Sequence, residues 1–517
     1  MKKMLIVMFM LMMLVIQVNY IYSQDIGEEP ISSPSLVGEL SSSTIVSGGQ
    51  VTYYTHHEFT NIMTTTVTTP AQNTGDGYIF VGATSQFYGG PSAAIILDNA
   101  GEPIYIQTFN NNFFVGDFRK QTVNGTDYLT YHAGSNTGGW TYGSSYVLNE
   151  NYQIVDTWTI DNGLGSDIHE LLLLDNGHAI LLAYVPIPFD LSPFGGPANG
   201  TLIEIVIQEQ DADKNVVFEW VGSEHMPIGD TEVNINTTDP VDFLHTNAVA
   251  VDNDGNWLLS HRNFNEITKI SRQTGDIIWR MGGAGNEFTF INDIGFYNQH
   301  NINRLDNGHL LLFDNGNSHT PPHSRMVEYI VDEVAKTVTL HEMYPAGTEG
   351  FSVAMGNAQR LSNGNSMIGW GTQPKLTEVQ MGGSVALEML LGSITYRVFR
   401  YPWTGVPTKA PRAVVQYDAN PTAVTVYTSW NGATDITSYD VYAGPTASTM
   451  AMVGSEPRSG FETEIPLTGL PSDTCFFQTK PIHNQGDPTP FSNITFRRDL
   501  QVCRDQLSHS YMPVFFK

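Results

Sequence analysis

The chain has 517 residues, with 52 acidic against 24 basic side chains and a net charge of -28 at pH 7. Hydrophobic residues make up 41% of it, which is enough for a packed interior and excludes a disordered chain. The length exceeds what one small core supports and predicts several domains. A surface this acidic repels phosphate backbones, so we expect no nucleic-acid partner.

The N-terminus has the pattern of a secretory signal peptide over residues 1–23. Lys2 and Lys3 precede an apolar run from Met4 to Ile16, and Ser23 is a candidate cleavage position. An uncleaved membrane anchor is the alternative. No later segment is long and apolar enough to cross a bilayer. After cleavage we therefore expect a secreted or extracellular protein without a membrane span, periplasmic if the source is bacterial.

The sequons and the cysteines fit an exported chain. Four N-x-S/T sequons are candidate glycosylation sites if the host glycosylates, with acceptors Asn124, Asn199, Asn236 and Asn493. The two cysteines, Cys475 and Cys503, can pair in one disulfide, and two unpaired core thiols are the alternative. Two cysteines are too few for a disulfide-rich scaffold or a cysteine-based metal cluster.

Short apolar runs alternate with Asn-Gly, Asp-Gly and Gly-Gly turns, whereas long amphipathic helical patterns are nearly absent. A D/S-N-G turn before an apolar strand recurs, as in LDNGH at 174–178 and 305–309, with a period of roughly 40–50 residues. This period is typical of propeller blades, small twisted sheets that cover one another's faces by radial stacking. We expect six units, at about 76–110, 112–160, 167–221, 243–283, 296–346 and 351–404.

The predicted fold class is therefore all-β, a six-bladed β-propeller followed by a small β-sandwich. A proline-rich boundary at 402–411 separates the two. Beyond it, alternating apolar and polar residues around Trp430 resemble a fibronectin type III-like sandwich. The expected organisation is a signal peptide at 1–23, an N-terminal extension with one or two possible strands at 24–75, the propeller at 76–404, the sandwich at 408–498 and a tail at 499–517.

Three histidines occupy the same position in successive units, just before the first strong strand. They are His169, His245 and His300, and Arg262 lies one strand after His245. Because equivalent positions of propeller blades project toward one axis, we expect these four side chains to converge. The alternative for each histidine is a structural role, capping a turn or bonding a neighbouring blade.

Four other histidines receive a different interpretation. His178 and His309 follow the Asn-Gly turn, and we expect them at the outer rim. His319 and His323 lie in the proline-rich segment NSHTPPHS. We favour a solvated loop there over a metal site, so no metal is expected.

Two adjacent segments resemble the arylsulfotransferase family, the bacterial-type enzymes that do not use a phosphonucleotide: FLHTNAVAVDNDGNWLLSHRNFNEITKISRQTGDIIWRMGG and QHNINRLDNGHLLLFDNG. The resemblance covers roughly 76–404 and rests on the ordered blocks H-x-N, S-x-R, Q-H and F-D-N-G. It implies a six-bladed propeller with a sulfate-binding funnel. It also implies transfer of a sulfuryl group from an aryl sulfate to a phenolic acceptor in two displacement steps, without a cofactor.

The resemblance also implies roles for individual residues. His300, in the Q-H block, would take the sulfuryl group as a transient sulfohistidine. His245 or His169 would protonate the leaving phenol and then serve as base to the acceptor. Arg262 and Asn247 would bind the sulfate.

Elementary chemistry accounts for these residue types. Positioned cationic donors stabilise the charge on a sulfuryl group in transfer, and the planar fork of Arg262 suits two sulfate oxygens. A neutral imidazole is a competent nucleophile near pH 7. Glu170 departs from the pattern, because it adds a negative charge near an anion site if it points inward. No GxxxxGK[S/T] loop occurs, which argues against a nucleotide-type sulfate donor.

The function expected from the sequence is a secreted sulfotransferase acting on small aryl sulfates and phenols. A non-catalytic propeller that binds sulfated or carbohydrate ligands is one alternative. A histidine-based metal hydrolase on the same propeller is another, and stoichiometric metal would identify it. The oligomeric state cannot be read from the sequence.

Overall fold

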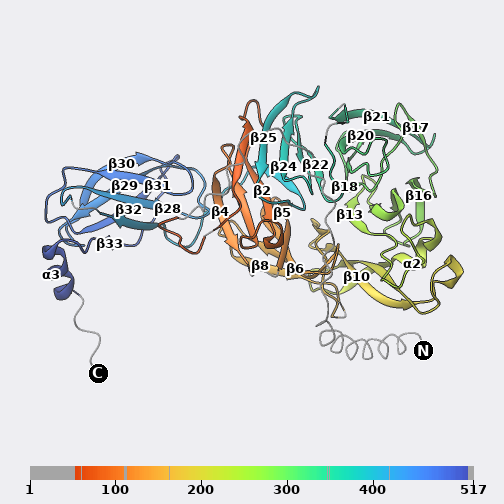
Figure 1. Ribbon diagram of the computed structural model, residues 1–517, viewed down its shortest axis with the longest axis horizontal. Coiled ribbons are helices and arrows are strands. Elements are labelled where there is room, and N and C mark those ends of the chain that lie inside the picture. Colours follow the sequence, from red (N-terminus) through yellow and green to blue (C-terminus); the bar gives the residue numbers. More distant parts are fainter. Residues whose placement is uncertain are drawn as a thin grey trace. The chain divides into compact units, whose positions relative to one another are not determined.

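The computed structural model describes residues 53–510, apart from 60, 110–112, 162, 346, 349 and 418–419. The signal peptide predicted at 1–23 lies outside the described residues. Strands make up most of the ordered structure, and the helices of the described part are short (Figure 1). None of these helices has the length and apolar character needed to span a bilayer. The fold is all-β, as the sequence predicts.

Residues 65–401 form six mainly antiparallel sheets of four or five strands, which we number 1 to 6 in chain order. Sheet 1 holds β2 (Tyr78–Ala83), β3 (Ala93–Leu97) and β4 (Pro103–Thr108), and sheet 2 holds β5 (Phe113–Val123), β6 (Thr126–Asn136), β7 (Thr141–Leu148) and β8 (Ile154–Trp158). Sheet 3 holds β9 (Leu171–Leu173), β10 (Ala179–Phe189), β11 (Gly200–Gln210) and β12 (Val216–Val221).

Sheets 4 to 6 repeat the same up-and-down order. Sheet 4 holds β13 (Thr246–Val251), β14 (Trp257–His261), β15 (Glu266–Ile270) and β16 (Ile277–Gly282). Sheet 5 holds β18 (His300–Arg304), β19 (Leu310–Asp314), β20 (Arg325–Asp332) and β21 (Thr337–Tyr344), with β17 (Thr289–Ile291) added in parallel to β21. Sheet 6 holds β22 (Asn357–Arg360), β23 (Ser366–Gly369), β24 (Lys375–Val379) and β25 (Val385–Leu391).

The first strand of this region joins the last sheet, and its last strand joins the first sheet. β1 (Thr65–Thr69) pairs with β25 of sheet 6, and β26 (Val398–Tyr401) pairs with β2 of sheet 1. The expectation of a sixth unit running to 404 is therefore wrong at its end, because β26 belongs to sheet 1. Such an exchange covers edge backbone groups that would otherwise remain open. The closed, six-bladed arrangement stays a prediction.

Each sheet shares a buried apolar cluster with the next sheet. Trp220 of sheet 3 and Trp257 of sheet 4 lie in one such cluster. A corresponding cluster joins sheet 6 to sheet 1, where Met389 packs in the same group as Ile79. Face-to-face burial between neighbouring sheets is what radial stacking requires, since each sheet is apolar on both sides.

The residues after this region form two further sheets and a helix. One sheet orders β27 (Arg412–Gln416), β28 (Val424–Ser429) and β31 (Thr463–Leu467), and the other orders β30 (Ala451–Pro457), β29 (Ile436–Gly444), β32 (Phe476–His483) and β33 (Thr495–Phe496). Their inward residues share one core, including Val426, Val441 and Phe477. The assignment to the fibronectin type III type stays a prediction.

The tail expected at 499–517 contains α3 (Gln501–Ser510), which a disulfide between Cys475 and Cys503 links to the preceding sheet. The remaining helical segments lie in connections between strands: α2 (Gly222–His225) and the 3-10 turns η1 (Ser85–Phe87), η2 (Ser192–Phe194), η3 (Ile228–Asp230) and η4 (Arg262–Phe264). The sequon residues Asn124, Asn199, Asn236 and Asn493 are all exposed. Their glycosylation stays a prediction.

One buried asparagine fastens β26 to sheet 6. Asn357 Nδ2 donates to the carbonyl of Val398 at 2.8 Å, and Asn357 Oδ1 accepts from the amide of Val398 at 2.8 Å. Both backbone groups of Val398 therefore have a side-chain partner at the point where the two ends of the region meet.

We predict that Asn357→Ala lowers the free energy of unfolding by about 1–3 kcal/mol for each backbone group of Val398 left unpaired. Urea unfolding followed by tryptophan fluorescence measures the change. Asn253→Ala, at an exposed asparagine, is the control and should change stability by no more than about 0.5 kcal/mol. Equal effects of the two substitutions would contradict the fastening role.

Candidate functional site

The hairpin β13–β14 places His245 and Arg262 side by side. Thr246 pairs with His261, and just beyond that pair the amide of Arg262 donates to the carbonyl of His245 at 3.0 Å. His245 has a φ of +49°, a conformation that is costly for a bulky side chain and often marks functional positions. Its Nδ1–H donates to Asp242 Oδ2 at 2.6 Å, which fixes the ring and leaves Nε2 as the acceptor.

His300 begins β18 and is held by a neutral partner. Its Nδ1–H donates to Asn315 Oδ1 at 2.7 Å, and the amide of Asn315 donates in turn to the carbonyls of Ser352 and Met355. Asn315 belongs to the F-D-N-G block, directly after β19. The arrangement makes Nε2 the nitrogen of His300 with a free lone pair in the ring plane.

His169 lies in the turn before β9 and is held by a carboxylate. Its Nδ1–H donates to Asp167, which also accepts from the amide of Thr141 at 2.5 Å. Thr141 Oγ1 contacts His132 Nε2 at 2.9 Å, so the chain of bonds continues into sheet 2. Burial alone would raise the pKa of Asp167, but the bonds from His169 and Thr141 hold it below its usual value.

The three imidazoles meet, as the repeat predicts. The ring centroids of His169 and His245 are 5.1 Å apart, and those of His245 and His300 are 6.5 Å apart. The ring of Tyr184 lies against the first two, at 5.3 Å from His169 and 5.6 Å from His245. His169 and His300 are buried, whereas His245 and Arg262 are partly exposed, so solvent reaches the cluster on the side of those two residues.

Burial and the nearby guanidinium favour uncharged imidazoles. Burial, followed by the charge of Arg262 and the contacts with His245 and His169, lowers the pKa of His300 well below its usual range. Burial also lowers the pKa of His245, although the carboxylate of Asp242 acts in the opposite direction. His300 is therefore neutral at pH 7, and its Nδ1 contacts two uncharged oxygens, the side-chain amide of Asn315 and the carbonyl of Asn298 at 3.1 Å.

A short segment contacts both Arg262 and His300. The carbonyl of Val353 accepts from Arg262 Nη2 at 3.2 Å, and the amide of Met355 donates to His300 Nε2 at 3.2 Å. Met355 itself has a φ of +62°. The segment thus contacts Nε2 of His300 and one terminal nitrogen of Arg262, whose other terminal nitrogen, Nη1, donates to Asn263 Oδ1 at 2.9 Å. The amide of Met355 must move away before Nε2 of His300 can attack.

Asn247 lies at the site, but its amide group is used within the protein. It is fully buried, and Nδ2 donates to the carbonyl of Gln299 at 2.7 Å, which links sheet 4 to the residue before β18. Oδ1 has no hydrogen-bond partner among the described residues. Binding of sulfate by Asn247 stays a prediction.

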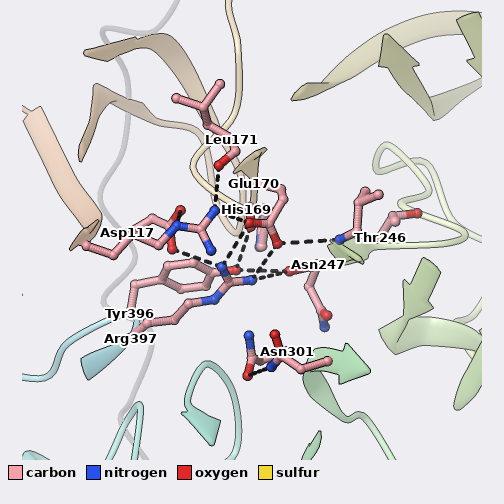
Figure 2. Close-up of polar contacts among 12 residues, drawn as sticks. Asp117, His169, Glu170, Leu171, Thr246, Asn247, Asn301, Tyr396 and Arg397 are labelled. Carbon is pink, nitrogen blue, oxygen red and sulfur yellow. Dashed lines mark hydrogen bonds and ion pairs between the residues drawn. The ribbon is translucent and has the colours of Figure 1, made fainter. Parts of the chain in front are cut away.

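Glu170 points inward, and its charge is compensated. Arg119 Nη2 donates to Glu170 Oε1, and Arg397 Nη2 lies 3.3 Å from Glu170 Oε2. Arg397 also contacts Asp117 Oδ1 at 2.9 Å and donates to the carbonyl of Asn247 at 2.9 Å. Figure 2 shows Arg397 between the carboxylates of Asp117 and Glu170.

This buried charge network joins four sheets. Asp117 and Arg119 belong to β5 of sheet 2, Glu170 precedes β9 of sheet 3, Arg397 precedes β26 of sheet 1, and Asn247 belongs to β13 of sheet 4. The two negative charges of the acids and the two positive charges of the arginines sum to zero. The negative charge expected of Glu170 is therefore already neutralised, and it does not oppose an anion next to Arg262.

The remaining histidines lie away from this cluster. His178 Nδ1 and His309 Nδ1 each lie 2.6 Å from a carboxylate oxygen of the third strand of their own sheet, Glu209 and Glu328 respectively. His319 is buried, with Nε2 at 2.7 Å from Asp314 Oδ2. The expectation of a solvated loop is therefore wrong for His319, because Asp314 draws its ring into the interior.

Sequence reasoning missed the residues that hold the imidazoles. Asp167 stands two positions before His169, and Asp242 three positions before His245. These spacings are a readable signal, because a carboxylate commonly orients a functional imidazole. Tyr184 and Tyr396 gave no signal, since their contacts with His169 depend on how distant strands pack.

The comparisons with known proteins agree with the residue blocks. The family model described as arylsulfotransferase (ASST) matches residues 119–392, more than half of the chain. The chain belongs to the arylsulfotransferase family. The matched region contains His169, His245, Arg262 and His300. Among curated proteins, none matches the chain.

Several solved structures are similar to this chain at low identity. A protein of unknown function from Bacteroides caccae is 13% identical, with 62% of this chain and 97% of that chain covered and a TM-score of 0.39. A virginiamycin B lyase from Staphylococcus aureus is 11% identical, with coverage of 71% and 95% and a TM-score of 0.29. The β-propeller domain of Cps50 (Swd1) from Myceliophteria thermophila is 10% identical, with coverage of 71% and 97% and a TM-score of 0.33. At these scores they indicate nothing about function.

We predict that Arg397→Met lowers the free energy of unfolding of the protein by about 3–5 kcal/mol, because it leaves buried carboxylates without their full compensation. The control is Arg412→Met, whose exposed ion pair with Glu58 should contribute no more than about 1 kcal/mol. Urea unfolding measures both. A similar loss of unfolding free energy in the two variants would show that the buried network contributes no more to stability than an exposed ion pair.

Proposed function

We propose that this protein transfers a sulfuryl group from an aryl sulfate to a phenol through a sulfohistidine at His300. The observation that carries the proposal is the meeting of three imidazoles beside one guanidinium, with a carboxylate behind two of the rings and an amide behind the third. Membership of the arylsulfotransferase family supports aryl sulfates and phenols as the substrate classes.

The partners of the three rings support His300 as the nucleophile. A carboxylate that accepts from Nδ1–H orients an imidazole and stabilises the positive charge that the ring carries while it exchanges a proton through Nε2. Asp167 and Asp242 stand in that position behind His169 and His245. Asn315 offers His300 only a neutral oxygen, and burial together with Arg262 lowers the pKa of His300. His300 is therefore the ring that keeps a lone pair for attack.

In the first displacement, His300 Nε2 attacks sulfur, the N–S bond forms and the bond between sulfur and the aryl oxygen breaks. Arg262 stabilises the charge on the sulfuryl oxygens during transfer. The departing phenolate takes a proton from Nε2 of His245 or His169 in its protonated form, because phenols have a pKa near 10 and leave poorly as anions. The products are sulfohistidine and a neutral phenol.

The second displacement reverses the first with a different phenol. The ring that gave its proton now removes one from the acceptor hydroxyl, and the acceptor oxygen attacks sulfur. The N–S bond breaks, and His300 returns to its neutral form. Because the two half-reactions are chemically symmetric, one donor serves both.

The segment containing Val353 and Met355 supports a site that rearranges on binding. A sulfate group that takes the fork of Arg262 replaces the carbonyl of Val353, and attack by His300 replaces the amide of Met355. Arg262 thus exchanges a bond to an uncharged carbonyl for bonds to an anion, which favours opening. The N-terminal pattern supports export, to the periplasm in a bacterium, as the place where this occurs.

We predict that the purified protein releases a coloured phenol from its aryl sulfate only when an acceptor phenol is present. His300→Ala should abolish this release and also the labile sulfuryl adduct that mass spectrometry detects on the His300 peptide after quenching with donor. His323→Ala, at a loop histidine that bonds only the carbonyl of Pro321 in the described structure, should retain both. Ligand binding without turnover would favour a non-catalytic binding module instead.

A second prediction concerns the pH dependence of the first half-reaction. Because the pKa of His300 lies well below its usual value of 6.5, the neutral nucleophile persists as the pH falls, and the acid limb should lie below pH 6.5. Asn315→Asp places a carboxylate behind the ring, raises the pKa of His300 and should move the acid limb to higher pH. Rapid-quench measurement of phenol release gives the profile.

Asp242→Asn is the matched control for that profile. It removes the carboxylate that raises the pKa of His245, so it should leave the acid limb in place and shift the basic limb downward where His245 is the proton donor. If the acid limb moves with Asp242→Asn but not with Asn315→Asp, the assignment of His300 as the nucleophile is wrong.

A further inference from the structure

The fourth strand of each of the six sheets carries a bulge at the same place. In every sheet the pairing between the third and fourth strands skips one residue of the fourth strand. In five sheets the skipped residue is aliphatic, and in sheet 5 it is a histidine: Ile104, Val155, Val217, Ile278, His341 and Ala386. Packing at this position therefore does not require His341.

His341 lies next to a histidine and a buried carboxylate. Its Nε2 is 4.0 Å from Glu328 Oε1, and its ring centroid is 4.8 Å from that of His309. His309 Nδ1 is 2.6 Å from the same carboxylate oxygen. One ligand atom from each of these residues lies within 4.8 Å of the others. Glu328 is buried, His309 partly buried and His341 exposed, so the group is accessible from solvent.

Sheet 3 offers a natural comparison, because it contains the same histidine and glutamate without the second histidine. There Arg272 contacts both oxygens of Glu209, with Nε at 2.7 Å from Oε2 and Nη2 on Oε1. In sheet 5, Arg360 Nη2 contacts Oε2 of Glu328. Oε1 of Glu328 is left to His309 and to a long contact of 3.3 Å from the amide of Asn307.

The local charge also differs in favour of a cation. Arg360 Nη2 lies 2.6 Å from Glu342 Oε2 as well as contacting Glu328. Arg360 therefore compensates two carboxylates with a single positive charge. The net negative charge remains beside two imidazoles, and neutral imidazole nitrogen with carboxylate oxygen is a donor set that zinc prefers.

We propose that His309, Glu328 and His341 bind a zinc ion, with water as the fourth ligand. Zinc ligands at about 2.0–2.1 Å from the metal lie roughly 3.3 Å from one another in a tetrahedron. The two separations from Glu328 Oε1, 2.6 Å and 4.0 Å, lie on either side of that value, so small side-chain movements suffice. In the zinc-bound form His309 Nδ1 is unprotonated and the ring proton is on Nε2.

The ion would tie together the turn before β19, the strand β20 and the strand β21. This role is independent of sulfuryl transfer, because none of its three ligands contacts His169, His245, Arg262 or His300 in the described structure. Zinc binding and turnover can therefore fail separately.

The experiment measures zinc on the full-length protein after treatment with EDTA and dialysis against excess zinc. Wild-type protein should retain one more zinc per chain than His341→Val, which installs the residue that two other sheets carry at this position. Isothermal titration should show the affinity of this site weakened by at least about tenfold in His341→Val and in His341→Gln. Zinc should raise the melting temperature of the wild type and not that of the two variants.

His178→Ala is the matched control, since it removes the corresponding histidine of sheet 3 and should keep the zinc. Any zinc held by His169, His245 and His300 is common to all these proteins and cancels in the comparison. Equal zinc content of wild type and His341→Val overturns the proposal. A wild-type protein that takes up no zinc in excess metal also overturns it, as does loss of this zinc from the His178→Ala variant.

Discussion

The buried contact of Arg397 with Asp117 and Glu170 is the constraint on which the candidate site depends. The four charged groups of that network come from three sheets, and the carbonyl of Asn247 brings in a fourth. A buried charge is tolerated only when it is paired and hydrogen-bonded. The sheets must therefore keep their angular spacing, since a shift of any one of them would separate an acid from its base. His169 directly precedes Glu170, and His245 lies two residues before Asn247, so the network also positions these two histidines.

The same compensation shapes the electrostatics of the site. The charges of the buried network, Asp117, Arg119, Glu170 and Arg397, cancel one another. The positive charge of Arg262 is therefore not neutralised by this network and acts on its surroundings. It lowers the pKa of His300 and would attract an anion into a molecule whose net charge is -28. Local arrangement thus overcomes the unfavourable field of the whole protein, which acts at longer range and is weakened by salt.

Much of the fold and of the candidate site could be predicted from the sequence, and the features that could not be predicted share a physical reason. The repeated D/S-N-G turns located the sheets, because such turns report local backbone geometry. The shared phase of His169, His245 and His300 predicted their convergence. The placement of β26 in sheet 1 could not be read, since a four-residue apolar strand carries no information about its partner. The compensation of Glu170 was hidden for the same reason, because Arg397 lies far from it in the sequence.

The exchange of strands at the two ends of the sheet region bears on how the chain matures. Val81 and Val398 are partners although 317 positions separate them, so sheet 1 has no inner strand until nearly the whole region has been synthesised. Long-range pairing of this kind makes folding slow. A nascent chain therefore cannot complete its first sheet until the last strand of the region has left the ribosome.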